Sequence, residues 1–296
     1  MHPSTILFRG RKNEYTHQGL FDTISEVGII PSKFVTSLGR ANLPRQPVFY
    51  CSTNEETVVR EVTQWYINDN GRANDLITKK VMGMDWSPFT CMMTISAWIV
   101  KEDLNIGLLF GGEQKRSLAI QDCAKRRYNL ANGETSNYIK SKNILLDFFS
   151  DEFGKLAVRH EFDYVYSALY SSSVLNNHNY IENASIQFDG IKYPSIANDF
   201  RGENYAISET AFKTKFEFVG ANFCYTCNNK KTIIDCDSTV LIGRDKCAFL
   251  QSDGSFLWGD CEDTFDYVTR INNQFHLVTL SDIPNRFSKA VKRISS

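Results

Sequence analysis

The order in which the hydrophobic pattern changes along the chain constrains its fold more than any other sequence feature. From about residue 211 onward apolar and polar residues alternate, as in "FKTKFEFVGANFCYTC" and "KCAFLQSDGSFLWGD", and alternation is typical of half-buried β-strands. Residues 114–180 place apolar residues three and four positions apart, which is typical of amphipathic helices. Strand-like runs lie on both sides of that stretch. The sequence therefore predicts a mixed α+β protein with a helical insertion and a β-rich C-terminal extension.

The elements before the helical stretch can be predicted one by one. "STILFRGRK" opens the chain as a strand, "PVFYCS" is a second compact strand, and "FTCMMTISAWIV" and "LNIGLLF" are further strand-like runs. "PVFYCS" leads into "STNEETVVREVTQWYI", where Thr53 or Asn54 can cap a helix and two glutamates fill its first turn. We expect a strand, a cap and a helix in that order.

Composition and charge exclude some function classes. The chain has 33 basic and 34 acidic residues, a net charge of -1, which gives no bulk electrostatic reason to bind nucleic acid or an anionic membrane. "MHPSTILFRGRKNEY" lacks the basic and apolar pattern of a secretory signal. No run approaches the roughly 18 apolar residues of a spanning helix. We expect a cytoplasmic protein that binds neither nucleic acid nor membrane.

Polar side chains crowd around the second strand. Arg40 ends the loop that leads into this strand, Tyr50 lies at the end of the strand, and Glu61 lies on the second turn of the following helix. A guanidinium binds phosphate in a bidentate manner, a tyrosine ring stacks on a planar base, and a carboxylate stabilises a positive centre. Each residue alone would be read as a surface charge, a rim tyrosine or a solvated helix charge. Chain geometry could bring all three to the mouth of one cleft for an anionic substrate, and a well-solvated hairpin edge is the other interpretation.

Two blocks of this sequence resemble the RES domain family. "GRANLPRQPVFYCSTNEETVVREV" is similar to the family's Gly-Arg-Xaa-Asn, Pro/Gly turn, Val-Xaa-Tyr strand and helical Glu. "DGIKYPSIANDFRGENYAI" is similar to its Asp-Gly-Ile-Xaa-Tyr-Pro-Ser segment, which is followed by Gly-Xaa-Asn-Xaa-Ala. The family's Arg, Glu and Ser fall on Arg40, Glu61 and Ser195, and Tyr50 is implied as a further pocket residue.

The resemblance implies an ADP-ribosyltransferase-like core. This core would comprise residues 1–210, with an inserted segment at about 67–185, whereas residues 211–296 have no counterpart in the family. NAD is the implied substrate, cleaved at the nicotinamide–ribose bond by a glycohydrolase or phosphorylase. Such an enzyme would be a toxin of a toxin–antitoxin or effector–immunity pair, with a cognate inhibitor protein and the option of a homodimer. A protein ADP-ribosyltransferase and a non-catalytic nucleotide-binding or sensor module remain open as alternatives.

The resemblance also implies roles for single residues. Glu61 would stabilise positive charge at the anomeric carbon more in the transition state than in the ground state. Arg40 would hold the pyrophosphate, and Tyr50 would stack on the nicotinamide or flank it. Ser195 would donate its hydroxyl to the nicotinamide amide or to a phosphate.

Further residues are candidates for the same pocket. Asn204 and Tyr193 are expected to support it from behind the residues that contact NAD. Arg9 and Arg11 on the opening strand could line the cleft floor, and Arg201 could cap it; Arg9 is the preferred member of these three. We therefore include Arg9, Asn204 and Tyr193 in the predicted NAD-binding set.

The cysteines offer a zinc site only on imperfect spacing. Cys224 and Cys227 form one close pair, but Cys236 and Cys247 stand apart from each other, whereas structural zinc sites favour two close pairs. In an alternating strand, residues three positions apart point in opposite directions unless a turn intervenes. Buried reduced thiols are thus the expected state of the cysteines, and zinc is the alternative.

Overall fold

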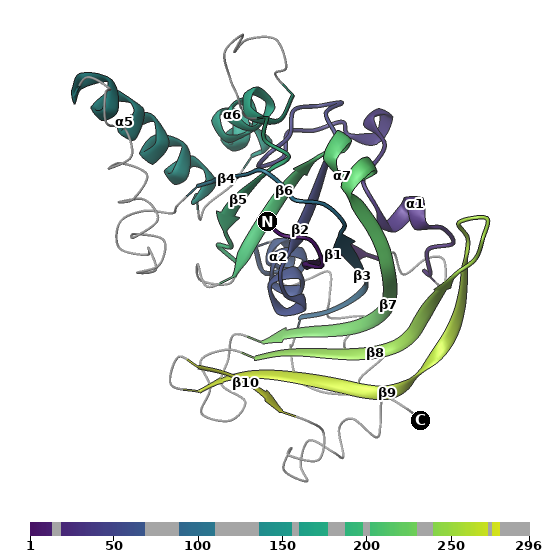
Figure 1. The fold of residues 1–296 in the computed structure, drawn as a ribbon. Helices are drawn as coiled ribbons and strands as arrows, with labels where there is room; N and C mark the ends of the chain where they lie inside the picture. The colour runs from purple at the N-terminus through teal and green to yellow at the C-terminus, as the bar shows by residue number, and fades with distance from the viewer. Residues whose placement is uncertain are drawn as a thin grey trace. The chain divides into compact units, whose positions relative to one another are not determined.

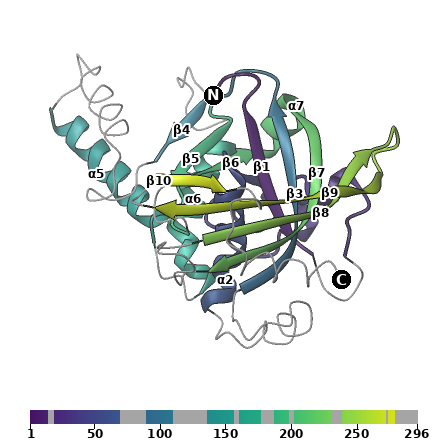
Figure 2. The same cartoon turned by 90° about the horizontal axis from the view of Figure 1, so that it is seen from below.

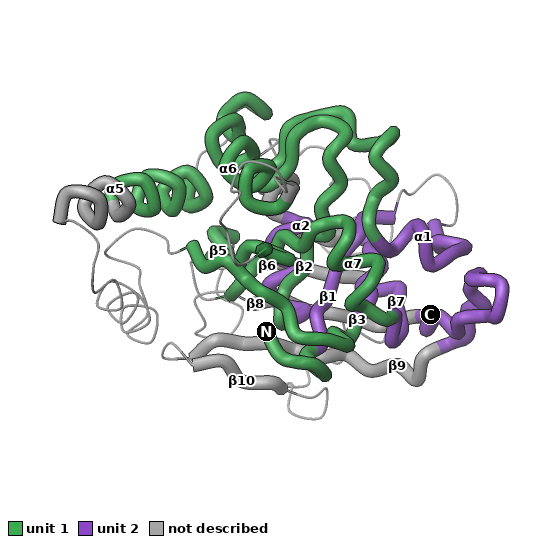
Figure 3. Tube along the Cα trace, turned by 45° about the horizontal axis from the view of Figure 1, so that its top comes forward, with its two compact units in different colours: residues 1–5, 29–53, 99–217 green, residues 6–28, 54–98, 218–296 purple. Residues whose placement is uncertain are grey.

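The described part of the chain is a mixed α+β protein whose strands pair mostly in antiparallel fashion, which confirms the predicted fold class at this level. The structure is a computed structural model, and it describes residues 1–13, 19–68, 89–109, 136–155, 160–176, 187–197, 202–229, 239–271 and 274–278. These residues form two compact units (Figure 3). Unit 1 contains Met1–Thr5, Ile29–Thr53 and Ile99–Glu217, and unit 2 contains Ile6–Gly28, Asn54–Trp98 and Phe218–Ser296.

Unit 1 is built on four short strands that are hydrogen-bonded in the order β2-β6-β5-β4 (Figure 1). β2 pairs with β6 and β6 with β5 in antiparallel fashion, and β5 with β4 in parallel. The strands are β2 (Val48–Ser52), β4 (Ile106–Leu108), β5 (Gly190–Pro194) and β6 (Glu203–Ser208). The helices are η2 (Ser32–Phe34), α5 (Ser136–Phe153), η4 (Glu161–Tyr164), α6 (Val165–Asn176) and α7 (Glu209–Lys215).

The register of these strands assigns side chains to two faces. Tyr50 lies opposite Ala206, which lies opposite Ile191, and alternation along each strand places Tyr193 on the same face. Helix α6 packs on β5 and β6, and α5 reaches the same core through Phe153. The core members are Ala41, Val48, Leu109, Phe153, Leu175, Ile191, Tyr193 and Ala206.

The opposite face of β2 packs against the α7 region. Phe49 has no solvent exposure, and its ring stacks on that of Phe212 at a centroid distance of 4.3 Å. The ring of Phe216 lies 5.8 Å from that of Phe49. Both faces of β2 are therefore buried, which explains why "PVFYCS" is apolar at successive positions instead of alternating.

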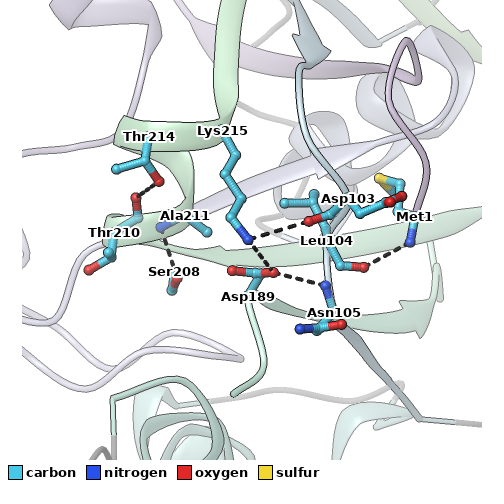
Figure 4. Close-up of polar contacts among 10 residues, drawn as sticks. All are labelled: Met1, Asp103, Leu104, Asn105, Asp189, Ser208, Thr210, Ala211, Thr214 and Lys215. Carbon is cyan, nitrogen blue, oxygen red and sulfur yellow. Dashed lines mark hydrogen bonds and ion pairs between the residues drawn. The ribbon is translucent and has the colours of Figure 1, made fainter. Parts of the chain in front are cut away.

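A carboxylate at the start of β5 connects three segments of unit 1 (Figure 4). Asp189 accepts hydrogen bonds from Lys215 Nζ at 3.0 Å and from the Asn105 amide at 2.8 Å. Lys215 Nζ also donates to the Asp103 carbonyl at 3.3 Å, and the side chain of Asp189 is only 12% exposed. These bonds fix the end of α7 and the segment before β4 against β5.

Unit 2 contains the longer strands, hydrogen-bonded in the order β10-β9-β8-β7-β3-β1. Figures 1 and 2 show β7, β8 and β9 running side by side, and their pairing is antiparallel. The strands are β1 (Ile6–Lys12), β3 (Phe89–Val100), β7 (Phe216–Asn229), β8 (Thr239–Leu250), β9 (Phe256–Ile271) and β10 (Gln274–Val278). The helices are α1 (Ile24–Val27) and α2 (Glu55–Asn68).

Helix α2 begins and packs as the sequence predicts. Asn54 Oδ1 accepts a hydrogen bond from the Thr57 amide at 2.8 Å, so Asn54 caps the helix. Val58 and Val62 lie against Gly10 of β1, where a Cβ would come within 2.5 Å of Val58 Cγ1 and 3.0 Å of Val62 Cγ2. Glycine in the opening strand thus lets the helix approach the backbone.

The predicted helical stretch at residues 114–180 is confirmed in its described part, where α5 ends at Phe153 and α6 begins at Val165 after the short η4. One sequence prediction about element bounds is wrong. The alternating tail does not start at 211, because α7 occupies its first residues. Ser208 caps α7 by accepting a hydrogen bond from the Ala211 amide at 3.2 Å, and this capped turn prevails over the short alternating pattern. The predicted helix in "SLAIQDCAKRRYNLA" lies outside the described residues.

Candidate functional site

The Gly39–Asn42 loop of unit 1 is held by its own polar groups. The Gly39 amide donates to the Asn42 carbonyl at 3.0 Å. Asn42 Nδ2 donates to the carbonyls of Ser37 and Leu43, both at 3.2 Å. A Cβ on Gly39 would overlap Asn42 Oδ1, so the close turn requires glycine. The loop that carries Arg40 is therefore a fixed structure.

Tyr50 ties this loop to strand β2. Its hydroxyl accepts a hydrogen bond from the Ala41 amide at 2.7 Å and donates one to Asn42 Oδ1 at 2.8 Å. Ala41 and Asn42 are both buried, so these bonds satisfy groups that water does not reach. The ring of Tyr50 packs at the edge of the unit 1 core. Tyr50 thus has a structural role, that of the rim tyrosine which its sequence position alone indicates.

Arg40 extends from this loop to the end of helix α5. Its Nη1 donates a hydrogen bond to the Phe153 carbonyl, and its guanidinium lies over the Tyr164 ring, 5.0 Å from the centroid. Carbonyls in the last turn of a helix lack intrahelical donors and carry the negative end of the helix dipole. A guanidinium has five N–H groups, and within the described residues the other four have no hydrogen-bond partner. Arg40 is therefore anchored on one side by the Phe153 carbonyl and the Tyr164 ring.

Three further predicted residues lie on β5 and β6 or directly after β5. Asn204 is paired with both Ser52 and Tyr193, and its side chain is on the face of Tyr50 and Tyr193. Tyr193 is 5% exposed, and its ring lies 5.0 Å from that of Phe153. Ser195 is fully buried, and its amide donates to the Gly202 carbonyl at 2.8 Å. The structure thus gathers Tyr50, Tyr193 and Asn204 on one face of unit 1 and places Ser195 next to its edge.

Glu61 and Arg9 belong to unit 2. Glu61 is half-buried on α2, and Arg9 on β1 is 6% exposed. Arg60 pairs with Glu56, since its Nε lies 2.7 Å from Glu56 Oε1. The expectation that Glu61 and Arg9 join Arg40 and Tyr50 in one cleft stays a prediction.

The two other arginines that could contribute to the predicted cleft are Arg11 and Arg201. Arg11 donates to the Glu26 carbonyl, and its guanidinium lies 5.1 Å from the centroid of the Phe21 ring. Burial lowers the pKa of Arg11, and the charge of Glu26 opposes this effect. Arg11 is thus engaged by α1 and the segment before it. Arg201 lies outside the described residues.

Sequence reasoning missed a buried carboxylate beside the anchor of Arg40. Glu152 is 8% exposed in the last turn of α5, next to the residue whose carbonyl binds Arg40. Its Oε2 lies 2.5 Å from Lys155 Nζ. An acidic residue near a helix C-terminus opposes the helix dipole, and that signal could have marked Glu152 in the sequence. Tyr164, under the guanidinium of Arg40, had no such signal.

An unusual acid–base environment lies on the other face of β6. Tyr205 is 5% exposed and donates to Glu203 Oε2 at 3.2 Å. Burial raises the pKa of Tyr205 far above its ordinary value, and the negative charge of Glu203 adds to the effect. Glu203 also forms an ion pair with Lys192, whose Nζ lies 2.5 Å from Glu203 Oε1. This face carries Tyr205 as a neutral phenol throughout the physiological pH range.

The cysteines fulfil the sequence expectation in part. Cys51 and Cys224 are free and buried, as predicted, but Cys247 is disulfide-bonded, so the expectation of a reduced thiol is wrong there. Cys227 lies on the same unbroken strand as Cys224, without the turn that a zinc knuckle needs, and Cys236 is outside the described residues. Across the described ranges no group of three or more His, Cys, Asp or Glu side chains could hold a metal ion.

Comparison with known proteins gives no independent information about the candidate site. No protein-family model matches the sequence, and no curated protein matches it. The resemblance to the RES family therefore rests on the two sequence blocks, and family membership stays a prediction. Among the described helices, none has both the length and the apolar character needed to cross a membrane.

Proposed function

We propose that this protein binds NAD and cleaves the bond between nicotinamide and ribose, as a glycohydrolase or a phosphorylase on an ADP-ribosyltransferase-like core. The observation that supports this most is the fixed Gly39–Asn42 loop with Arg40 anchored at the Phe153 carbonyl. A guanidinium with free donors in one plane is what a pyrophosphate needs for bidentate binding. Tyr50 on the adjacent face would provide aromatic surface for a planar ring, and Tyr193, only 5% exposed, would support it from behind.

The chemistry assigned to Glu61 rests on charge development. When the nicotinamide–ribose bond breaks, its electron pair leaves with the ring nitrogen and positive charge builds at the anomeric carbon. A carboxylate near that carbon stabilises the transition state more than the ground state. Because nicotinamide leaves as a neutral molecule, no general acid is required, in keeping with a candidate set that contains no histidine. Water or phosphate would then attack the anomeric carbon.

The proposed activity implies biological partners. NAD cleavage would be lethal to its own cell unless restrained, so we propose a toxin with a cognate inhibitor protein that covers the substrate site. The proposed location is the cytoplasm, where NAD is available, and a homodimer is compatible with it. Nucleic acid and membrane are not among the proposed partners.

One observation favours a second function, a nucleotide-binding module without turnover. Arg40 and Tyr50 already hold the Gly39–Asn42 loop and the end of α5, so both can be explained by binding and structure alone. Thermal stabilisation by NAD without any product would identify this function. Transfer of ADP-ribose to a protein acceptor would instead identify a protein ADP-ribosyltransferase.

The test is product analysis by mass spectrometry after incubation with NAD, with and without phosphate. The proposal expects release of nicotinamide together with ADP-ribose or its 1-phosphate. Glu61→Gln should lower kcat about 100-fold or more, a typical loss for one electrostatic catalytic group. Glu55→Gln, which changes a first-turn acid of the same helix, should retain activity. If the wild-type protein releases no nicotinamide with water, phosphate or a protein acceptor, it is not an NAD-cleaving enzyme.

A further inference from the structure

Glu203 at the start of β6 collects contacts from three strands of unit 1. Its Oε1 lies 2.5 Å from Lys192 Nζ of β5, and its Oε2 accepts a hydrogen bond from the Tyr205 hydroxyl of β6 at 3.2 Å. Its main-chain carbonyl accepts a hydrogen bond from Ser52 Oγ of β2 at 2.7 Å. One residue therefore connects β2, β5 and β6 through both its side chain and its backbone.

The contacts of the Glu203 side chain are anchored by a buried group. Tyr205 is 5% exposed, whereas the side chains of Lys192 and Glu203 are 27% and 38% exposed. The Lys192 ammonium also lies 5.9 Å from the centroid of the Tyr205 ring. An exposed ion pair alone contributes little to stability, but here the buried phenol holds the carboxylate in place for the lysine. We call Lys192, Glu203 and Tyr205 the Glu203 clamp.

The Glu203 clamp lies where the pairing of β5 with β6 ends. Pro194 and Glu203 form the final pair of this ladder, and beyond it the Ser195 amide donates to the Gly202 carbonyl at 2.8 Å. The ends of a ladder open more readily than its middle. A cross-strand contact between side chains next to the end opposes that opening. The clamp is therefore placed to keep Ser195 and the end of β5 against β6.

The three strands that Glu203 connects also carry three residues of the candidate site. Tyr50 lies on β2, Tyr193 on β5 and Asn204 on β6, all on the face of the sheet opposite to the Glu203 side chain. Asn204 directly follows Glu203 in the sequence. A shift of these strand ends would therefore move the candidate residues relative to one another.

We propose that Glu203 is a positioning residue of the candidate site, and that the Glu203 clamp fixes the strand ends that carry Ser195 and Asn204. The inference rests on the proposed NAD cleavage and adds to it a residue that does not contact the substrate. Ser195 would bind NAD in the ground state and in the transition state alike. Loss of the clamp should therefore raise KM and leave kcat nearly unchanged.

Steady-state kinetics of NAD cleavage with the full chain test the clamp. Glu203→Gln keeps the shape of the side chain but removes its charge, and it should raise KM for NAD about fivefold while kcat changes by less than about twofold. Lys192→Met should have the same effect, whereas Lys192→Arg keeps a cation for the carboxylate and should retain the wild-type KM. The matched control is Glu209→Gln, which breaks an ion pair with Lys213 at 2.6 Å on α7 of the same unit and should change neither constant.

Amide hydrogen exchange, measured without NAD, separates the clamp from the proposed function. The Ser195 amide should exchange at least about fivefold faster in Glu203→Gln than in the wild type, while the amides of α7 keep their rates. If the wild type releases no nicotinamide, the proposed function fails, and faster exchange would still show that the clamp fixes these strand ends. Unchanged exchange with an unchanged KM in Glu203→Gln would refute the positioning role. A lower Tm with the wild-type KM would also refute it, because it would show a purely structural contact.

Discussion

Replacing Tyr50 by phenylalanine removes one oxygen atom and tests how the Gly39–Asn42 loop is held. In the structure the hydroxyl accepts a hydrogen bond from the Ala41 amide at 2.7 Å and donates to Asn42 Oδ1 at 2.8 Å. Phenylalanine keeps the ring and its packing but makes neither bond. The variant therefore isolates the polar contribution from the hydrophobic one.

The expected cost follows from the burial of the two partners. Ala41 is 1% exposed and Asn42 is 8% exposed, so water cannot replace the lost donor and acceptor. A buried N–H left without a partner costs about 1–3 kcal/mol, and a lost net hydrogen bond about 0.5–1.5 kcal/mol. The free energy of unfolding should fall by about 2–4 kcal/mol, which is a decrease in Tm of at least about 4 °C for a chain of this size.

Thermal unfolding followed by circular dichroism measures the effect. The control is Tyr166→Phe, because Tyr166 is 55% exposed and exposed substitutions change stability by less than about 0.5 kcal/mol. If the two variants unfold at the same temperature, the hydroxyl of Tyr50 does not hold the loop, and the fixed geometry of Arg40 has another cause.

Two further predictions concern buried charge and pH. Because the pKa of Tyr205 is raised, its phenol keeps the proton in the folded state above about pH 10, whereas the unfolded chain releases it. The free energy of unfolding should therefore fall with rising pH above that point by up to about 1.4 kcal/mol per pH unit. In urea unfolding, the free energy of unfolding of Tyr205→Phe should fall less steeply between pH 10 and 11 than that of the wild type. Equal slopes for the two proteins would contradict this. Arg60→Ala should destabilise by about 3–5 kcal/mol, because it leaves the buried carboxylate of Glu56 without its guanidinium. The double variant Glu56→Leu/Arg60→Met should regain most of that stability in the same assay, and a double variant as unstable as Arg60→Ala would argue against a charge effect.

Local sequence signals predicted the elements around the candidate site well. The strand at "PVFYCS", the cap at Asn54 and the helix after it all lie where short-range patterns indicate. These features depend on residues within a few positions of one another, such as the Asn54 side chain and the Thr57 amide. The same is true of the strands at both ends of "DGIKYPSIANDFRGENYAI".

Long-range contacts explain what the sequence could not predict. Arg40 binds the carbonyl of Phe153, which is 113 positions away along the chain, and no pattern near Arg40 indicates that partner. The Tyr50 ring was expected to stack on a ligand, and nothing near Tyr50 in the sequence indicated that its hydroxyl accepts from the buried Ala41 amide. The helix at Glu209–Lys215 was missed because five alternating residues outweighed a single capping serine. The predicted division of the chain after residue 210 and the meeting of Glu61 with Arg40 stay predictions.

The interleaving of the two units has a consequence for how the chain is made. It passes from one unit to the other after residues 5, 28, 53, 98 and 217. By the time residue 217 has been synthesised, every segment of unit 1 exists. Unit 2 still lacks β8, β9, β10 and most of β7, the strand that pairs with β3. A nascent chain at that stage, or a fragment ending there, exposes the hydrogen-bonding edge of β3, and open edges promote aggregation. Folding during synthesis should therefore complete unit 1 first, and the open edge of β3 in unit 2 is covered only after β7 has been made.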